Sequence, residues 1–378
     1  MTTLDVPTRQ GTATPDRPPP SPAAPSSAAP RPPARPRRTR SLTGEDVLAL
    51  VGSIAASFSL VVIGYGHILD FSGILGFLVC WYVTFIALYV VVLAISLPRA
   101  IVVERVVTAM LYMAAAIVLF ALGTTIVYTI GQGWRALDHL NFFTKDMSAV
   151  APSAPLSQGG IYHAIVGTVV EVGIAVAVSV PLGLGTAVFM TEVGGRGSQL
   201  VRTVVEAMTA LPEILAGLFV YAVLIVEFGM AKSGIAVAIA MAVTMTPIVA
   251  RAGEVALRVV PGGLRDACGA LGASHWKTVW KVVLPTAGPG LVTAVILAIA
   301  RGIGETAVVL ICANASNFLT YEPIGKPMNS LPLFIYTMYI THEPNAIVRA
   351  FGAASVLLFM VLALFVVARL LVRERKVR

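Results

Sequence analysis

The chain has 378 residues, of which 57% are hydrophobic and 12% are charged, and its formal net charge is +8. Soluble globular domains usually carry about 25% charged residues and about 45–50% apolar residues. The composition therefore excludes an ordinary soluble enzyme and an intrinsically disordered protein, and it favours a polytopic membrane protein. Cytoplasmic loops explain the basic excess better than nucleic-acid binding does. The three cysteines are too few and too far apart to indicate a disulfide framework or a metal site.

Residues 1–44 form a tail rich in Pro, Ser, Thr, Ala and Arg. A segment of this composition buries too little apolar surface to fold, so we predict a disordered cytoplasmic tail. Its basic end, residues 31–40, indicates a topology signal that touches anionic membrane lipid. A regulatory or partner-binding role is the alternative.

Apolar segments long enough to cross a bilayer as helices follow the tail. We place them at about 46–66, 73–97, 104–130, 161–190, 203–228, 234–250, 287–312 and 346–371. Eight spans put both termini on one side, and most of the 27 Lys and Arg residues lie inside if that side is the cytoplasm. The predicted fold class is therefore an all-α polytopic membrane protein with about eight transmembrane helices and cytoplasmic termini.

Three connecting segments are long. The outer segments at about 131–160 and 313–345 are polar, and they either dock an external partner or simply connect spans. The inner segment at about 251–286 carries a more specific pattern. It reads Asp266-Ala-Cys-Gly-Ala-Leu-Gly272, then nine residues, then Val282-Val-Leu-Pro285.

The inner segment predicts two short helices. The first has Asp266 near its start, Gly272 permits a bend, and Pro285 marks the entry to the next span. The second helix is expected to carry one apolar stripe, formed by Trp276, Val279, Trp280 and Val283. A helix pair of this kind on the inner face fits a cleft in a cytosolic partner.

This pattern resembles the EAA coupling loop of permease subunits of binding-protein-dependent ABC importers. The glycine, leucine and proline of that loop stand here at the same spacing, whereas Asp266 replaces Glu, Cys268 replaces the second Ala and Val282 replaces Ile. In that family the loop docks into the nucleotide-binding subunit, and the family fold is the type I ABC importer permease fold. The resemblance implies that the ATPase-coupling residues are Asp266, Ala267, Gly272, Leu284 and Pro285.

The chain contains no phosphate-binding G-x-x-x-x-G-K-[ST] segment. We therefore expect a non-catalytic subunit with no cofactor of its own, whose ATP and Mg are bound by a partner ATPase.

Charged residues also lie inside the seventh predicted span. Arg301 and Glu305 are four residues apart and would share a helix face, and Thr306 adds a hydroxyl. A charge at the bilayer centre costs roughly 2.5–3.5 kcal/mol on insertion scales, so such residues mark substrate pathways. The planar fork of an arginine suits an oxyanion. We predict an anion pathway at Arg301, with a packing ion pair as the alternative.

The run Ile-Ala-Arg301-x-x-Gly-Glu305-Thr-Ala resembles the phosphate-specific (Pst) branch of these importers. With Gly217-Leu-Phe-Val-Tyr221 and the stretch 160–167, it is most similar to the PstA type. The resemblance covers roughly 104–372. It departs from the family at Val308-Val309, where Pro-Leu is frequent, and at Glu213, where a small residue usually follows the proline.

The resemblance divides the chain into the tail 1–44, two additional transmembrane helices at 45–100, and an ABC importer transmembrane domain at 101–378. It implies a permease subunit of an ATP-driven phosphate importer in the cell membrane. The implied partners are a PstC-like permease subunit, an ATPase dimer and an external phosphate-binding protein.

Two further acidic residues lie within predicted spans and are candidate gating groups. Glu213 follows Pro212, which kinks a helix, and Glu171 lies well inside the fourth span. The sequence leaves open whether Glu171 pairs with Arg301 or faces water. The five histidines have no ligand spacing, so no metal site is expected.

Other readings stay open. Sulfate or molybdate importers share the coupling loop, so the substrate is an expectation. A scaffold that senses phosphate status through the pump would use the tail and the first two spans. A secondary transporter is a third alternative, but that function would not explain why the chain contains a coupling-loop pattern.

Overall fold

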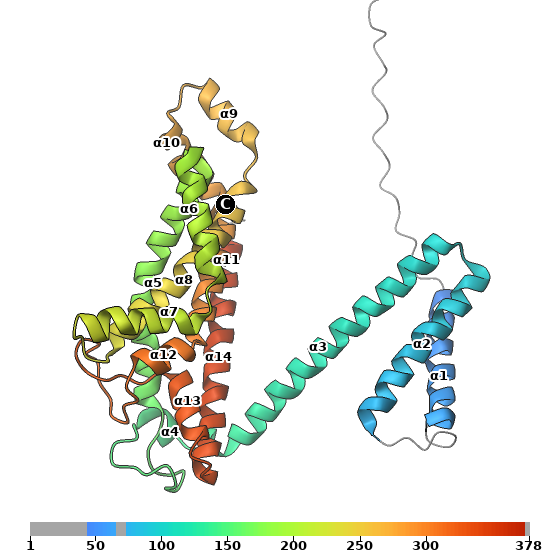
Figure 1. Ribbon diagram of the computed structural model, residues 1–378, viewed down its shortest axis with the longest axis horizontal. Helices are drawn as coiled ribbons and strands as arrows, with labels where there is room; N and C mark the ends of the chain where they lie inside the picture. Colours follow the sequence, from blue (N-terminus) through green and yellow to red (C-terminus); the bar gives the residue numbers. More distant parts are fainter. Residues whose placement is uncertain (1–43, 66–72, 375–378) are drawn as a thin grey trace, which may run out of the picture. The chain divides into compact units, whose positions relative to one another are not determined.

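The computed structural model describes residues 44–65 and 73–374 of the chain (Figure 1). Nearly all of the predicted tail, 1–43, lies outside the described residues. The residues that are described form helices and loops, with no strand among them. They divide into two compact units that meet at Ala115 and Ala116 within one long helix. The predicted boundary at residue 100 stays a prediction.

The first unit is a small helical group. It contains α1 (Gly44–Ile63), α2 (Ile74–Ser96) and the beginning of α3 (Arg99–Leu137). Its buried contacts gather around Phe85, Tyr89, Leu93 and Val102. The Arg105 guanidinium lies 2.8 Å from the Asp46 carboxylate, and Trp81 Nε1 donates a hydrogen bond to Ser57 Oγ. These polar contacts join helices that are otherwise apolar.

The second unit holds the remainder of α3 and all later helices. Its elements are α4 (Asn141–Thr144), α5 (Tyr162–Val188), α6 (Gly195–Ala210), α7 (Glu213–Val220), α8 (Gly234–Arg258), α9 (Gly262–Ala270), α10 (His275–Thr278), α11 (Leu284–Ile303), α12 (Ala307–Cys312), α13 (Leu331–Tyr339) and α14 (Pro344–Glu374). Three π-helical turns extend or join them: η2 (Phe189–Val193), η3 (Tyr221–Glu227) and η4 (Val279–Val283).

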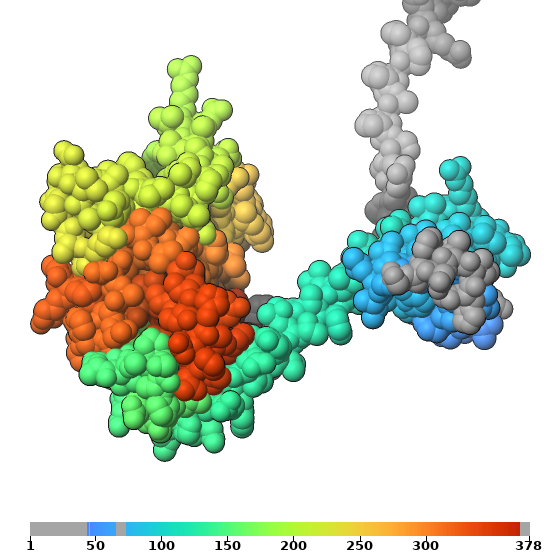
Figure 2. Space-filling view, turned by 60° about the horizontal axis from the view of Figure 1, so that its bottom comes forward, coloured from blue at the N-terminus to red at the C-terminus, as the bar shows by residue number. Residues whose placement is uncertain are grey.

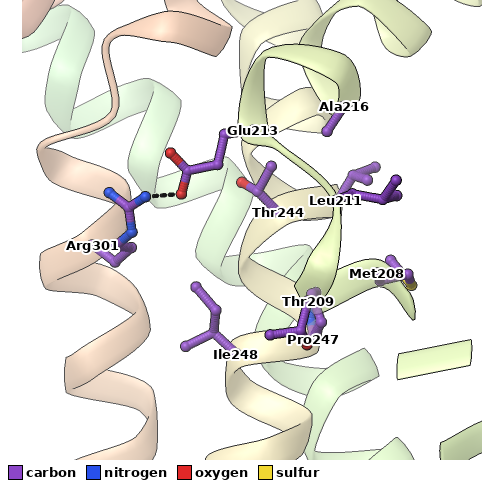
Figure 3. Close-up of a pocket in the computed structure, with 10 residues that line it drawn as sticks. Met208, Thr209, Leu211, Glu213, Ala216, Thr244, Pro247, Ile248 and Arg301 are labelled. Carbon is purple, nitrogen blue, oxygen red and sulfur yellow. Dashed lines mark ion pairs between the residues drawn. The ribbon is translucent and has the colours of Figure 1, made fainter. Parts of the chain in front are cut away.

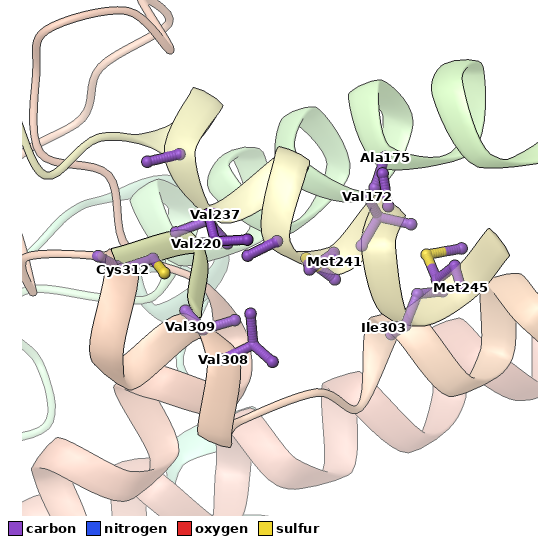
Figure 4. Packing of buried hydrophobic residues seen from close by; sticks show 14 of the residues in the cluster. Val172, Ala175, Val220, Val237, Met241, Met245, Ile303, Val308, Val309 and Cys312 are labelled. Atoms are coloured by element: carbon purple, nitrogen blue, oxygen red, sulfur yellow. The ribbon is translucent and has the colours of Figure 1, made fainter. Parts of the chain in front are cut away.

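Helices α5 and α8 form the centre of this unit, and small residues allow them to lie close together. A Cβ on Gly183 would stand 2.6 Å from Val249 Cβ, and a Cβ on Gly253 would stand 3.0 Å from Ala187 Cβ. Close approach at small residues drives helix association in lipid, where the hydrophobic effect between helices is absent. The largest buried cluster, around Met241 on α8, lies beside this contact (Figure 4).

Within residues 44–65 and 73–374, seven helices are long and apolar enough to cross a membrane, and one bent pair of helices raises the number to as many as eight, by length and composition. The number agrees with the predicted eight spans, but two of the predicted spans are wrong as continuous helices. The segment 203–228 is broken between α6 and α7, which bend by 101°. Pro212 has no N–H to donate, and it forces Leu211 into an extended conformation. The predicted span 287–312 is also two helices: α11 ends at Ile303, and α12 begins at Ala307.

The outer segments are ordered and joined to each other. Arg349 is 1% exposed and donates hydrogen bonds of 2.8–3.0 Å to carbonyl oxygens of the outer segment, those of Pro152, Ala154, Pro155 and Gln158. Met147 N–H donates to Asn317 O at 3.0 Å. Figure 2 shows the surface of residues around 141–160 (green) against the beginning of α14 (red).

One carboxylate also ties the outer segments together. Asp146 accepts hydrogen bonds from the N–H groups of Ser148 and Leu319 and from Ser148 Oγ. Burial opposes ionisation of this group, but these hydrogen bonds outweigh it and lower the pKa of Asp146 below its ordinary value. The two segments therefore form one outer surface.

Candidate functional site

A cavity of about 230 Å³ lies where the two broken helices face each other (Figure 3). Its walls come from α6, α7, α8 and α11, and they are mainly apolar. The lining residues are Met208, Thr209, Leu211, Glu213, Ala216, Val243, Thr244, Pro247, Ile248 and Arg301. Arg301 is the one basic side chain in this lining, and Glu213 is the one acidic side chain.

Arg301 and Glu213 form an ion pair inside this cavity. The proline break explains the geometry, because Pro212 occupies the N-cap position of α7 and makes Glu213 the first residue of that helix. A carboxylate in the first turn is stabilised by the helix dipole. The Arg301 side chain is still 49% exposed, so its guanidinium has donors available to a further ligand.

The predicted ion pair between Arg301 and Glu305 is present, but the two residues do not share a helix face. Helix α11 ends at Ile303, so Glu305 lies in the break that follows, and its carboxylate is 3.9 Å from the guanidinium. Glu305 Oε1 instead accepts hydrogen bonds from the N–H groups of Ala307 at 3.1 Å and Val308 at 3.4 Å. It thereby satisfies backbone donors at the start of α12. Thr306 precedes that helix and does not line the cavity.

Glu171 is separate from this constellation. Its side chain is on α5, 1% exposed, and neither carboxylate oxygen accepts a hydrogen bond from a described residue. It therefore neither pairs with Arg301 nor faces water in this conformation. The described residues hold no group of three His, Cys, Asp or Glu side chains arranged for a metal ion.

The inner segment forms the expected helix, bend and second helix. Helix α9 ends at Ala270, and Gly272 follows with φ of 78°, a left-handed conformation that side chains other than glycine rarely adopt. Helix α10 and η4 then run directly into α11, where Pro285 occupies the first turn. Figure 1 shows α9 and α10 at one end of the second unit, beyond α6.

Two details of this segment differ from prediction. Asp266 lies in the middle of α9, because that helix already begins at Gly262 after Pro261. The apolar stripe is also divided: Val279 and Val283 are buried against the bundle, whereas Trp276 and Trp280 are 53% and 69% exposed. Leu271, at the bend, is exposed as well. Exposed aromatic and aliphatic side chains of this kind suit a protein contact.

Ion pairs that the sequence did not reveal fasten this segment to the bundle. Arg265 on α9 lies 2.8 Å from Glu192, which is distant in sequence, and also donates to Val260 O. Glu254, buried near the end of α8, pairs with three arginines, Arg202, Arg251 and Arg258. The pairs Arg265–Glu192 and Arg202–Glu254 join different elements, so the local charge pattern gave no signal for them. Arg251 and Arg258 are three and four residues from Glu254 on α8, and that helical spacing does indicate their pairs.

Residues 179–377 match the protein family described as "Binding-protein-dependent transport system inner membrane component". The match covers more than half of the chain. The chain belongs to this family. Its membership and its long apolar helices confirm the predicted ABC importer permease fold and a multi-pass location in the inner membrane.

Two similar proteins of known name match this chain over three quarters or more of their own length. The chain is 41% identical to "Phosphate transport system permease protein PstA 1" of Mycobacterium tuberculosis (strain ATCC 25618 / H37Rv), over 61% of this chain and 75% of the relative. It is 31% identical to "Phosphate transport system permease protein PstA" of Haemophilus influenzae (strain ATCC 51907 / DSM 11121 / KW20 / Rd), over 70% and 92%. The recognised resemblance to the PstA type is thereby confirmed.

Among solved structures, the inward-facing MetNI methionine ABC transporter is similar at 23% identity. The similarity covers 57% of this chain and 94% of that chain, with a TM-score of 0.46.

Proposed function

We propose that this chain is a permease subunit of an ATP-driven importer of inorganic phosphate. The observation that carries the proposal is the 31–41% identity to phosphate transport permeases over most of their length. The cavity at Arg301 supports it, because a guanidinium within mainly apolar walls binds an oxyanion more strongly than it would in open water.

In this proposal Arg301 is the phosphate ligand of this half of the pathway. Glu213 neutralises the guanidinium while the pathway is empty, and phosphate would bind at the guanidinium donors that this ion pair leaves exposed. Glu305 holds the break after α11 open by capping α12, which keeps Arg301 at the cavity. Thr306 is a further candidate pathway residue, and Glu171 stays a candidate gating group.

The inner segment is the proposed contact with a separate ATPase. Asp266, Ala267 and Gly272 shape the first helix and its bend, while Leu284 and Pro285 lead into α11, the helix that carries Arg301. The continuous helical path from α10 through η4 to α11 gives a mechanical connection between the two sites. ATP and Mg belong to that partner, and this chain supplies no catalytic group.

The remaining partners are proposed from the same relatives. A second, PstC-like permease subunit would complete the pathway, an ATPase dimer would drive it, and an external phosphate-binding protein would deliver the substrate. The joined outer segments offer the binding protein an ordered surface.

The test is uptake of radiolabelled phosphate and radiolabelled sulfate into vesicles that contain the complete transporter. We expect ATP-dependent phosphate uptake that Arg301→Gln abolishes while the subunits still assemble. Arg301→Lys, which keeps the charge but not the planar fork, should retain partial activity. Sulfate uptake in place of phosphate uptake would overturn the substrate, and normal uptake by Arg301→Gln would overturn the role of the arginine.

A further inference from the structure

A second cavity, of about 580 Å³, lies at the inner end of the bundle and shares no residue with the cavity at Arg301. It opens between η2, α6, the end of α8, α9 and α10. The lining residues are Met190, Thr191, Glu192, Arg202, Arg258, Arg265 and His275. Three arginines and one histidine therefore face a single carboxylate.

The surrounding ion pairs leave positive charge in excess. Arg265 engages Glu192, and three arginines share Glu254. Only Arg251 has a further partner, the carboxylate of Glu206. Four arginines thus face three carboxylates, and exposed His275 adds a donor at the rim. A site with this balance attracts an anion.

Two of the arginines have N–H donors that the described residues do not use. Arg258 donates only from Nη2, to Glu254 at 2.7 Å, and its side chain is 58% exposed. Arg202 donates from Nε and Nη2, which leaves Nη1 free of described partners. Buried Glu254 holds both side chains in place, so their free donors are pre-positioned for the oxygens of a phosphate group.

The depth of the cavity indicates the source of that phosphate group. Two helices that are apolar enough to cross a membrane end beside the cavity, α5 with η2 at Val193 and α8 at Arg258. A cavity at the ends of spanning helices faces the headgroup region of a bilayer. Val193, Val255 and Val259 are exposed beside it and would contact acyl chains. Basic pockets between helices on the cytoplasmic side are a recurrent form of anionic-lipid recognition.

We propose that this inner cavity binds the phosphate group of an anionic phospholipid. Arg258 and Arg202 are the direct ligands, and His275 is a contact from the α9–α10 segment. The proposal is independent of the transported substrate. A bound lipid would rest against both α8 and the ATPase-facing segment, so lipid composition would influence the position of that segment.

The experiment uses the assembled transporter, stripped of lipid in detergent and titrated with phosphatidylglycerol while native mass spectrometry counts the bound lipids. Arg258→Gln removes one positive charge and its unused N–H donors from the cavity, and Glu254 keeps Arg202 and Arg251 as partners, so the fold should survive. We expect about fivefold weaker phosphatidylglycerol binding, the fold-change that corresponds to roughly 1 kcal/mol for one arginine near an anionic membrane surface.

Arg196→Gln is the matched control. Arg196 is exposed at the beginning of α6, does not line the cavity, and forms no ion pair with a described residue. This variant should bind phosphatidylglycerol like the unchanged protein. His275→Gln provides a second test from the other wall of the cavity, with a smaller loss expected.

Three results would overturn the proposal. The first is equal phosphatidylglycerol affinity in the unchanged protein and in both cavity variants. The second is binding of radiolabelled inorganic phosphate that Arg258→Gln removes while lipid binding is unchanged, because that would assign the cavity to a soluble anion. The third is lipid binding that appears only after the ATPase is removed, because the cavity would then be part of the subunit interface.

Discussion

Arg301 at the end of α11 and Glu213 at the beginning of α7 form an ion pair, although three α-helices, α8, α9 and α10, separate them in the sequence. Glu305, which is only four residues from Arg301, is the more distant partner at 3.9 Å. Two helix breaks create this arrangement. One break brings Glu213 to a helix start, and the other removes Glu305 from the helix face.

The Arg301–Glu213 pair should matter more for transport than for stability. Both side chains are partly exposed, and pairs of this kind contribute about 0–1 kcal/mol to folding. We expect Glu213→Gln to leave thermal unfolding nearly unchanged but to lower phosphate uptake at least about tenfold, equivalent to roughly 1.4 kcal/mol in the transport cycle. The measurements are a melting curve and vesicle uptake.

Glu206→Gln is the control for this prediction. Glu206 pairs with Arg251 at 3.2 Å with similar exposure, but it does not line the Arg301 cavity. An equal loss of uptake in both variants would show that Glu213 has no special role.

Gly272 should be required for coupling to ATP hydrolysis. Its φ of 78° costs an L-residue roughly 1–2 kcal/mol, so Gly272→Ala strains the bend that presents α9 and α10. We expect reduced phosphate-stimulated ATPase activity in the assembled transporter. Gly269→Ala, in the same segment but within helical backbone and with no atom within 4 Å of the added Cβ, should behave like the unchanged protein. Full coupling in Gly272→Ala would contradict the prediction.

The buried carboxyl group of Glu171 should make the folded bundle less stable than an apolar side chain at the same position would. A buried carboxyl group without a hydrogen-bond partner carries an uncompensated desolvation cost. Glu171→Met replaces it with an apolar side chain of similar length, and we expect a gain of about 1–3 kcal/mol in the free energy of unfolding. The melting temperature of the purified transporter measures this change. Loss of uptake by this variant in an intact complex would instead support the gating role.

Asp146 should make the outer surface sensitive to acid. Its folded-state pKa is below the ordinary value of 3.8, so its stabilising hydrogen bonds are fully present above that value. The contribution is lost as the pH falls through the lowered pKa, because the folded state must then accept a proton. Asp146→Asn should therefore lower the melting temperature at pH 7, with a difference that shrinks as the pH falls below 3.8. A difference independent of pH would refute the role of the charge.

The sequence by itself determined the fold class, the number of spans and the position of the helix–bend–helix segment on the inner side. Span length and low charge follow from the thickness and low polarity of the bilayer, which act on every apolar segment separately. The bend at Gly272 was predictable for the same local reason, since glycine adopts a left-handed conformation without strain. The sequence also marked Arg301, because a charge within an apolar span is costly wherever it occurs.

Only the tertiary structure decided which side chains meet. The sequence paired Arg301 with Glu305, which lies 3.9 Å away, but it missed the closer partner, Glu213, which comes from another helix and depends on the bend at Pro212. The same holds for the pair of Glu254 with Arg202 on α6, and for the isolation of Glu171. Helix periodicity governs neighbours within one helix, but contacts between helices depend on crossing angles and breaks, which arise only when all the helices pack together.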